Sequence, residues 1–189
     1  MNDNTALLVM HVQNMMVADY GGAEIIQPLQ RAIAASRENG VRVIYVRVAF
    51  TEGYPEVNPH NKMVVMVKEK VGVTLVDDEK TQIHASVRPN PGEPVTVNYR
   101  ISAFSGSSLE LLLRSLDIDA LVLTGISTGG VVLSTLLEAS DKDYGLTVLS
   151  DGSAEPDPDL QKTLMEKVFP LHGKVLTVDE WVTGLSAPR

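Results

Sequence analysis

The sequence contains no cysteine. Disulfides, thiolate metal ligands and a cysteine nucleophile are therefore excluded together, since each of them needs a thiol side chain. The chain has 189 residues, of which 44% are hydrophobic, and it is long enough to bury a core without a covalent or metal staple. We expect residues 1–189 to form a single domain, because domains usually contain about 100–200 residues.

The sequence is also poor in basic residues and has no long hydrophobic run. It has 16 Lys and Arg residues against 24 Asp and Glu residues, which gives a formal net charge of −8. An acidic surface repels nucleic acid and anionic membranes, and no hydrophobic stretch approaches the ~20 residues that span a bilayer. The first residues, MNDNT, lack the basic and apolar segments of a secretory signal. We expect a cytoplasmic protein whose partner is a small molecule, not nucleic acid or a membrane.

Strand-like and helix-like segments alternate along the chain. Short hydrophobic runs rich in branched residues predict strands at 6–10, 41–48, 95–99, 120–125, 146–151 and 174–178. Amphipathic segments predict helices at 23–39, 60–71, 108–116, 130–143 and 157–169, with a last helical turn at 179–181. This alternation is typical of βαβ units. The expected fold is α/β: a three-layer, doubly wound, six-stranded parallel sheet of order 3-2-1-4-5-6 with helices on both faces.

Three segments follow strands at the place where such a sheet binds ligands. They are MHVQN after the first strand, NYRISAF after the third and GISTGGV after the fourth. In a doubly wound sheet, ligands bind at the carboxyl ends of the strands, where the strand order reverses. The topology therefore predicts a site formed by these three segments, while residues 49–94 are expected to be an excursion over the sheet.

Together these segments resemble the isochorismatase-like superfamily, also called the cysteine hydrolases. The family includes nicotinamidases, N-carbamoylsarcosine amidohydrolases and isochorismatases. The likeness extends over nearly the whole chain, and it rests on SAF after the third strand, TGIST after the fourth and YGLTVLSDGSA around the fifth. Each motif alone is weakly specific, but their order and spacing are strongly so.

The resemblance implies an Asp–Lys–Cys triad, and this chain departs from it at every position. The family's Asp corresponds to His11, its Lys to Asn98 and its Cys to Val131. An alkyl side chain cannot attack a carbonyl, so catalysis through a thioester is excluded. Relatives have a cis peptide bond at the turn after the fourth strand, which the resemblance places between Ile126 and Ser127.

Two hypotheses about function follow from these replacements. In the first, His11 is a general base that acts on water or on Ser127, so that the candidate catalytic residues are His11, Asn98 and Ser127. The substrate would be a small amide, carbamoyl compound or vinyl ether. In the second, the chain is an inactive descendant that binds a small molecule or serves in assembly, and His11 is only hydrogen-bonded to Asn98.

The glycine-rich turn STGG could bind an anion or an oxyanion through its free N–H groups; alternatively, its glycines only relieve crowding. The expected pocket residues are Ser127, Thr128, Gly129, Gly130, Val131, Gln13 and Phe104. The segment RVAFTEG lacks the Asp-x-His pair of the metal-binding relatives, so we expect no metal and no cofactor. Because family members are commonly oligomeric, we expect a homo-oligomer, either a dimer or a tetramer.

Overall fold

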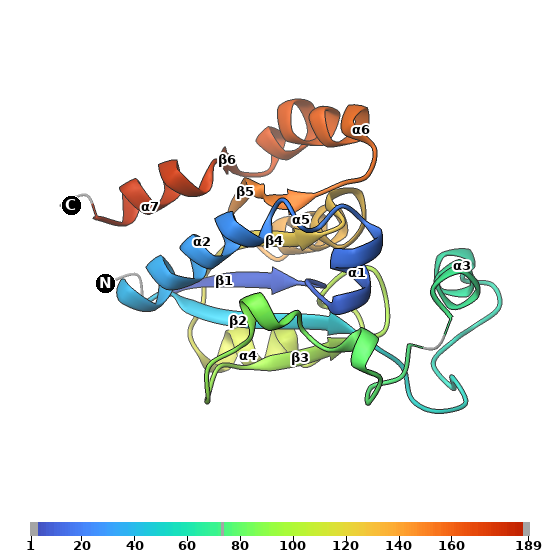
Figure 1. Cartoon of the computed structure of the whole chain (residues 1–189). Coiled ribbons are helices and arrows are strands. Elements are labelled where there is room, and N and C mark those ends of the chain that lie inside the picture. Colours follow the sequence, from blue (N-terminus) through green and yellow to red (C-terminus); the bar gives the residue numbers. More distant parts are fainter. Residues whose placement is uncertain (1–3, 73, 187–189) are drawn as a thin grey trace.

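The computed structural model describes residues 4–72 and 74–186. Six parallel strands form one sheet in the order β3-β2-β1-β4-β5-β6 (Figure 1). The strands are β1 (Thr5–Met10), β2 (Arg42–Val48), β3 (Val95–Asn98), β4 (Ala120–Ile126), β5 (Gly145–Ala154) and β6 (Lys174–Leu176). The predicted order 3-2-1-4-5-6 is confirmed, and the order reverses between β1 and β4.

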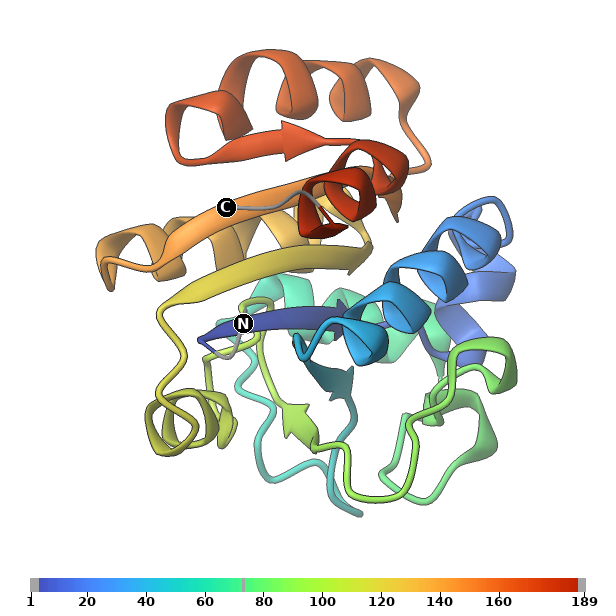
Figure 2. The same cartoon turned by 90° about the vertical axis from the view of Figure 1, so that its left-hand side faces the viewer.

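Helices cover both faces of the sheet and make it the middle of three layers (Figure 2). One face packs against residues of α1 (Asn14–Asp19), α2 (Ile26–Glu38) and α7 (Val178–Ser186). The other face packs against α4 (Leu109–Ser115), α5 (Leu133–Asp141) and the segment that follows α6 (Pro158–Thr163). Helix α3 (Lys62–Val71) belongs to the long connection between β2 and β3, on the side toward which the strands point (Figure 1).

Burial on both sides explains the uninterrupted hydrophobic run of β1. Residues Ala6 to Met10 are at most 1% exposed. Ala6, Leu8 and Met10 join the core on one face of the sheet, whereas Leu7 and Val9 join the core on the other face. Side chains alternate along a strand, so a strand covered by helices on both faces needs hydrophobic residues at every position.

Local chemistry explains features of two helices, α2 and α6. In α2, Leu29, Ala32, Ile33 and Ser36 are buried at helical spacing. Asp157 precedes α6, and its Oδ1 accepts hydrogen bonds from the backbone N–H groups of Asp159 (3.0 Å) and Leu160 (3.1 Å). The predicted N-cap of this helix, with a proline at its first position, is thus confirmed.

Four helical segments differ from the sequence-based expectation. Helix α1 was not predicted, because six residues are too few to show a helical period. The helix expected at 157–169 is divided into α6, a π-helical turn Leu164–Val168 and a 3-10 turn Phe169–Leu171, where Pro170 offers no N–H donor. The helix expected at 130–143 starts as a π-helical turn, Thr128–Val132. Helix α7 has nine residues and ends at Ser186, whereas only a turn at 179–181 was expected.

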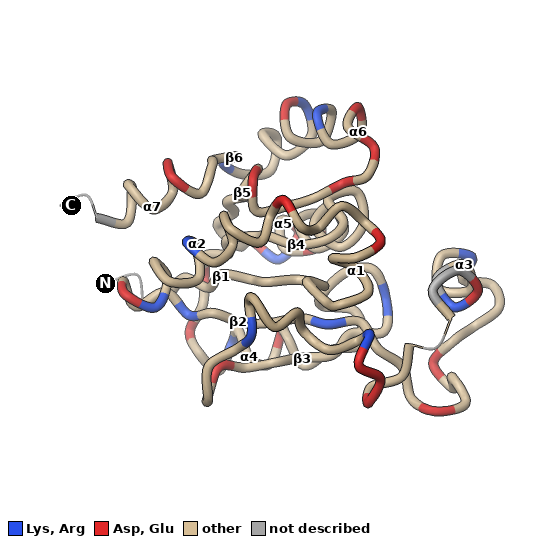
Figure 3. Tube along the Cα trace, viewed as in Figure 1, with Lys and Arg blue, Asp and Glu red and all other residues tan. Residues whose placement is uncertain are grey.

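Charged residues avoid the central strand. Figure 3 shows Asp and Glu distributed over helices and loops with Lys and Arg among them, while β1 carries no charge. Within residues 4–72 and 74–186, no helix combines the length and hydrophobicity needed to cross a membrane.

Candidate active site at the carboxyl ends of β1, β3 and β4

The predicted site residues stand at the ends of neighbouring strands. His11 directly follows β1, Asn98 is the last residue of β3 and Ser127 directly follows β4. In the sheet, Met10 is paired with both Val46 and Gly125, and Val48 with Asn98. Parallel pairing therefore aligns the three strand ends, and His11 and Ser127 line one cavity.

A glycine allows the close contact between two of these strands. Gly125 has φ +140°, and a Cβ atom at this position would lie 2.1 Å from the carbonyl oxygen of Met10. No side chain can be accommodated there without moving the backbone. Gly125 thus lets β4 lie close against the residue that precedes His11.

A hydrogen bond joins His11 to Asn98 and determines the tautomer of the imidazole. The Nε2 atom of His11 lies 2.9 Å from Oδ1 of Asn98. The Nδ2 group of Asn98 donates to the backbone carbonyls of Arg100 (2.8 Å) and Ser102 (3.0 Å), so its Oδ1 must be the acceptor in the contact with His11. Neutral His11 therefore carries its proton on Nε2, and Nδ1 retains a free lone pair.

Burial keeps His11 neutral. Its side chain is almost completely buried, and the cost of removing the charged form from water lowers its pKa from 6.5 to about 4, although the hydrogen bond to Asn98 acts in the opposite direction. At neutral pH the imidazole is an uncharged hydrogen-bond acceptor and a weak base, available at Nδ1.

The turn after β4 contributes Ser127, Gly130 and Val131 to the cavity. The peptide bond between Ile126 and Ser127 is cis, as the resemblance implied. The carbonyl oxygen of Ser127 accepts from the N–H groups of Gly130 (3.2 Å) and Val132 (3.3 Å). Among the residues that the structure describes, no hydrogen bond joins the Ser127 hydroxyl to His11. The geometry therefore does not support activation of Ser127 by direct contact with His11.

The cavity has a volume of about 200 Å³ and mostly apolar walls. Its floor is formed by His11, Ile126 and the turn after β4. Several of its walls come from residues that sequence reasoning did not single out, namely Met15, Met16, Tyr20, Met63, Met66 and Tyr99. The available signal was the unusual density of methionine in NMM and in KMVVM. The spacing of these methionines does not show that the two segments lie over a pocket.

Gln13 and Phe104 were expected in the pocket, and the structure places both in other surroundings. Gln13 is fully buried, and its side chain bonds to the N–H and C=O of Val48 (2.9 Å each) and to the C=O of Thr81 (2.6 Å). Gln13 thereby connects the end of β2 to the long segment between β2 and β3. Phe104 is part of the core and stacks on Tyr144, with ring centroids 6.1 Å apart. Neither is among the residues that line the cavity.

The carboxylate of Glu155 occupies one backbone N–H group of the turn after β4. Thr128 is fully buried outside the cavity, and the N–H of Gly129 donates to Oε2 of Glu155 at 2.8 Å. Glu155 directly follows β5 and so occupies one of the donors that the sequence offered to an anion. Thr128 and Gly129 are not among the residues that line the cavity. This role of Glu155 was missed because charge alone does not show which loop a carboxylate reaches.

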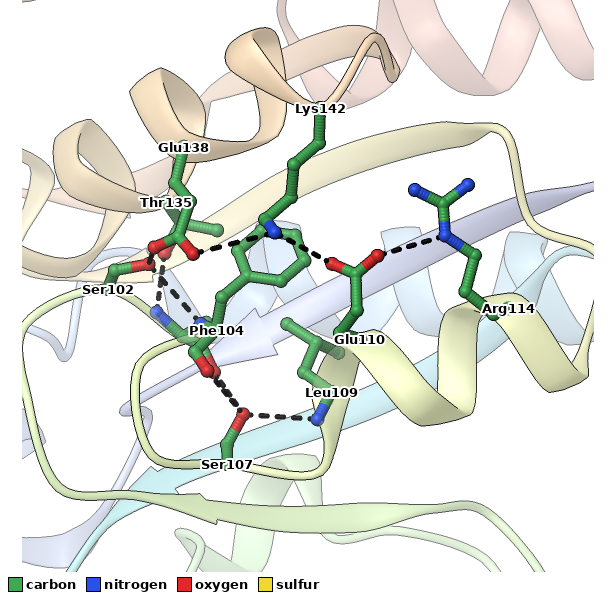
Figure 4. Close-up of polar contacts among 10 residues, drawn as sticks. Ser102, Phe104, Ser107, Leu109, Glu110, Arg114, Thr135, Glu138 and Lys142 are labelled. Carbon is green, nitrogen blue, oxygen red and sulfur yellow. Dashed lines mark hydrogen bonds and ion pairs between the residues drawn. The ribbon is translucent and has the colours of Figure 1, made fainter.

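A network on the side of α5 holds the loop that orients Asn98 (Figure 4). The hydroxyl of Ser102 donates to Oε2 of Glu138 (2.5 Å), and the N–H of Ala103 donates to the Thr135 hydroxyl (2.9 Å). Lys142 lies 3.9 Å from Oε1 of Glu138 and 3.2 Å from Oε2 of Glu110. Because Ser102 also accepts from Asn98, helix α5 is connected through this loop to the amide that fixes His11.

Ion pairs at the outer end of the network affect the pKa of Glu110. Burial raises this pKa, but Arg114 at 2.9 Å and Lys142 at 3.2 Å outweigh burial and keep it below its usual value. Figure 4 shows Lys142 between the carboxylates of Glu138 and Glu110, above the ring of Phe104. These residues are not among those that line the cavity, and their ion pairs connect α4 to the end of α5.

The structure gives no sign of a metal centre in the part of the chain that it describes. No group of three or more His, Asp or Glu side chains there is placed to hold an ion. His84 lies in the excursion, where its Nδ1 accepts from the N–H of Ser86 (3.3 Å) and its own N–H donates to the C=O of Val12 (2.9 Å). It anchors a loop.

Comparison with known proteins places these observations in a family. A family model described as "Isochorismatase domain" matches residues 5–180. The chain is similar to a ureidoacrylate amidohydrolase RutB from Serratia proteamaculans, with 30% identity over 97% of this chain and 84% of the relative. It is also similar to the protein of the same name from Variovorax paradoxus, with 31% identity over 97% of this chain and 82% of the relative.

Solved structures share the fold. A cysteine hydrolase from Pseudomonas syringae pv. phaseolicola aligns with a TM-score of 0.88 at 20% identity, covering 98% of this chain and 93% of that one. An isochorismatase family protein from Desulfovibrio vulgaris aligns with a TM-score of 0.87 at 21% identity, covering 97% and 99%. At these identities the likeness shows the architecture alone.

Proposed function

Because the chain belongs to the isochorismatase family of hydrolases, we propose that it hydrolyses a small amide, carbamoyl compound or vinyl ether without a cysteine, with His11 activating a water molecule. In this proposal His11, Asn98 and Val131 stand where the family has Asp, Lys and Cys. The observation that carries it is the contact between His11 and Asn98, which leaves the lone pair of Nδ1 free at a residue that lines the cavity.

For an amide substrate, the chemistry requires one base and one water molecule. Nδ1 of His11 accepts a proton from the water as the water oxygen forms a bond to the carbonyl carbon. The carbon–nitrogen bond then breaks, and the leaving nitrogen takes up the proton from His11. We favour water over Ser127 as the nucleophile because the described hydrogen bonds include none between Ser127 and His11.

A substrate panel with matched variants tests this proposal. Purified protein is assayed for hydrolysis of small amides, carbamoyl compounds and vinyl ethers, and activity in wild type should be lost in His11→Ala. Asn98→Ala should lower kcat because the imidazole loses the partner that fixes its tautomer. His172→Asn, which alters a histidine bonded to Ser140 away from the cavity, should leave kcat unchanged. Turnover that survives His11→Ala would exclude His11 as the base.

The pH profile gives a second check. A base with a pKa of about 4 is unprotonated across the neutral range, so kcat/KM should be constant from about pH 5 to pH 8 and should fall near pH 4. A profile that falls between about pH 6 and pH 7 would contradict a buried, neutral His11.

A second candidate function is small-molecule binding without turnover. Two observations favour it: the alkyl side chain of Val131 lines the cavity, and Glu155 occupies the N–H of Gly129 in the turn. Both reduce the capacity of the turn to stabilise an oxyanion. A binding protein would show ligand-dependent thermal stabilisation with no product formed from any compound of the panel.

We also propose that the whole chain forms one domain. Copies of this domain associate as a homo-oligomer, either a dimer or a tetramer. Exposed hydrophobic side chains on the outer helices, Leu111 on α4 (69% exposed) and Leu137 on α5 (40% exposed), support a contact between copies. Light scattering during size-exclusion chromatography tests this, and a monomer at micromolar concentration would contradict it.

A further inference from the structure

Methionines from two helices line the cavity. Met15 and Met16 come from α1, whereas Met63 and Met66 come from α3. These are four of the seven methionines in the chain. Methionine is unbranched and polarisable, so it adapts its shape to apolar ligands and makes favourable contacts with aromatic rings. The wall is suited to an apolar group and offers little to a hydrophilic one.

Aromatic residues close another side. Phe50 and Tyr99 line the cavity, and their ring centroids are 6.3 Å apart. Phe50 is 2% exposed, because it also packs against Tyr54 at 5.8 Å. This side of the cavity is therefore formed by two aromatic rings inclined at 47° to each other, while the methionine sides can adapt.

The cavity has one positively charged lining residue, and it lies at an edge of the cavity. Among the described lining residues the sole Lys or Arg is Arg100, whose N–H groups donate to the carbonyls of Tyr99 (2.6 Å) and Glu56 (3.0 Å). Arg100 also lines a neighbouring polar depression with His60 and Lys62, so it lies at the boundary between the two hollows. His11 on the floor is neutral. A carboxylate placed among the methionines, away from Arg100, would lose its hydration without gaining a partner.

The polar groups within the cavity suit an uncharged ligand that donates a hydrogen bond. Nδ1 of His11 is an acceptor, and the hydroxyl of Ser127, which also lines the cavity, either donates or accepts. A volume of about 200 Å³ is somewhat larger than the ~150 Å³ apolar cavity that binds benzene. It fits a ring or a branched alkyl group together with one small functional group.

We propose that the substrate of this cavity is a neutral molecule in which a branched-alkyl or aryl group adjoins the amide or carbamoyl group, and that carboxylates of similar shape are rejected. This inference rests on the proposed function in placing the ligand in the same cavity. It separates this chain from the relatives named for ureidoacrylate, which is an anion. The net charge of −8 acts in the same direction by repelling anions.

A pair of isosteric ligands tests the charge requirement. Isovaleramide carries an isopropyl group where malonamate carries a carboxylate, and the two are otherwise alike. Calorimetry on the wild-type protein should show isovaleramide, and phenylacetamide with it, binding at least tenfold more tightly than malonamate or ureidoacrylate. Equal or tighter binding of a carboxylate, or no binding of either neutral amide at millimolar concentration, would overturn the inference.

Variants test whether the methionines make the discrimination. Met63→Gln and Met16→Gln should each weaken binding of isovaleramide about tenfold, because an amide then faces the apolar ligand. Met63 is 41% exposed, so its substitution should be tolerated by the fold; the surface change Leu171→Gln, at a residue that is 80% exposed, should leave binding unaltered. Unchanged affinity in both methionine variants, with thermal midpoints like that of wild type, would contradict the role of this wall.

The outcomes separate this inference from the proposed function. Neutral amides that bind and are not hydrolysed would leave the preference for a neutral ligand standing and contradict hydrolysis of amides. Hydrolysis of ureidoacrylate that depends on His11, without binding of neutral amides, would support hydrolysis and overturn the inference.

Discussion

His11 makes the stability of the fold depend on pH. Its pKa is about 4 in the folded state and 6.5 without the fold, so the unfolded chain binds more protons between these values. Stability therefore falls as pH drops below 6.5, and the loss levels off near pH 4. Converted to free energy, the full shift corresponds to roughly 3 kcal/mol, of which about 2 kcal/mol is lost between pH 7 and pH 5.

The variant His11→Asn isolates this contribution. His11 has φ +55°, a conformation that asparagine tolerates better than most residues, and asparagine does not titrate. Urea unfolding at pH 7 and pH 5 should show a pH-dependent loss that is about 2 kcal/mol smaller in the variant than in wild type. Parallel losses in the two proteins would mean that His11 titrates normally in the folded state.

Gly125 is predicted to be among the least replaceable residues near the site. A Cβ atom there would lie 2.1 Å from the carbonyl oxygen of Met10, so β1 and β4 would have to separate beside His11. We expect Gly125→Ala to lower the free energy of unfolding by about 3 kcal/mol or more. Gly21→Ala is the control, since Gly21 has φ +69° with nothing within 4 Å, and it should cost only about 1 kcal/mol.

The contact between His11 and Asn98 could be predicted because both residues end strands whose order the alternation of elements determines. Side-chain direction within the connecting loops could not be predicted in the same way. Gln13 and Phe104 belong to matching motifs, yet one satisfies the backbone of β2 and the other packs on Tyr144. A motif gives the position of a residue along a loop, whereas burial and hydrogen bonding decide which way it points.

Helix α5 links the core to the site through the Thr135 hydroxyl. This hydroxyl accepts from the buried N–H of Ala103 at 2.9 Å, in the loop whose carbonyls hold Asn98. Thr135→Val keeps the shape and leaves that N–H without a partner, so it should lower stability by about 1–3 kcal/mol. It should also change the ¹⁵N shifts of the His11 ring, because the Asn98 amide is then held less firmly.

Asp141→Ala on the same helix is a suitable control. Asp141 is exposed, and this surface substitution should change stability by no more than about 0.5 kcal/mol. If Thr135→Val lowered stability without any change in the ¹⁵N shifts of His11, the loop would be a structural brace and not an orienting element.

Strands and helices differed in how far the sequence predicted them. The strands are buried on both faces, so their hydrophobic runs stand out, and each was expected within a few residues of its observed bounds. The helices near the site were less predictable, since the turn Thr128–Val132 has π-helical geometry and α1 has six residues. Neither shows a helical period in the sequence. The methionine wall of the cavity depends on α1, which was not predicted, and on α3, which was expected at 60–71. A helical period does not show where the long connection between β2 and β3 places α3.

For the molecule as a whole, the lengths of the two outermost strands restrict how copies can associate. β3 has four residues and β6 has three, and each borders the sheet on one side. So few free N–H and C=O groups make a poor template for a further strand. Growth into a fibre through a continuous sheet is thereby disfavoured, and self-association must use the helical surfaces. Light scattering should show a lower mass for Leu111→Glu, at a side chain that is 69% exposed, and an unchanged mass for Val95→Lys on β3.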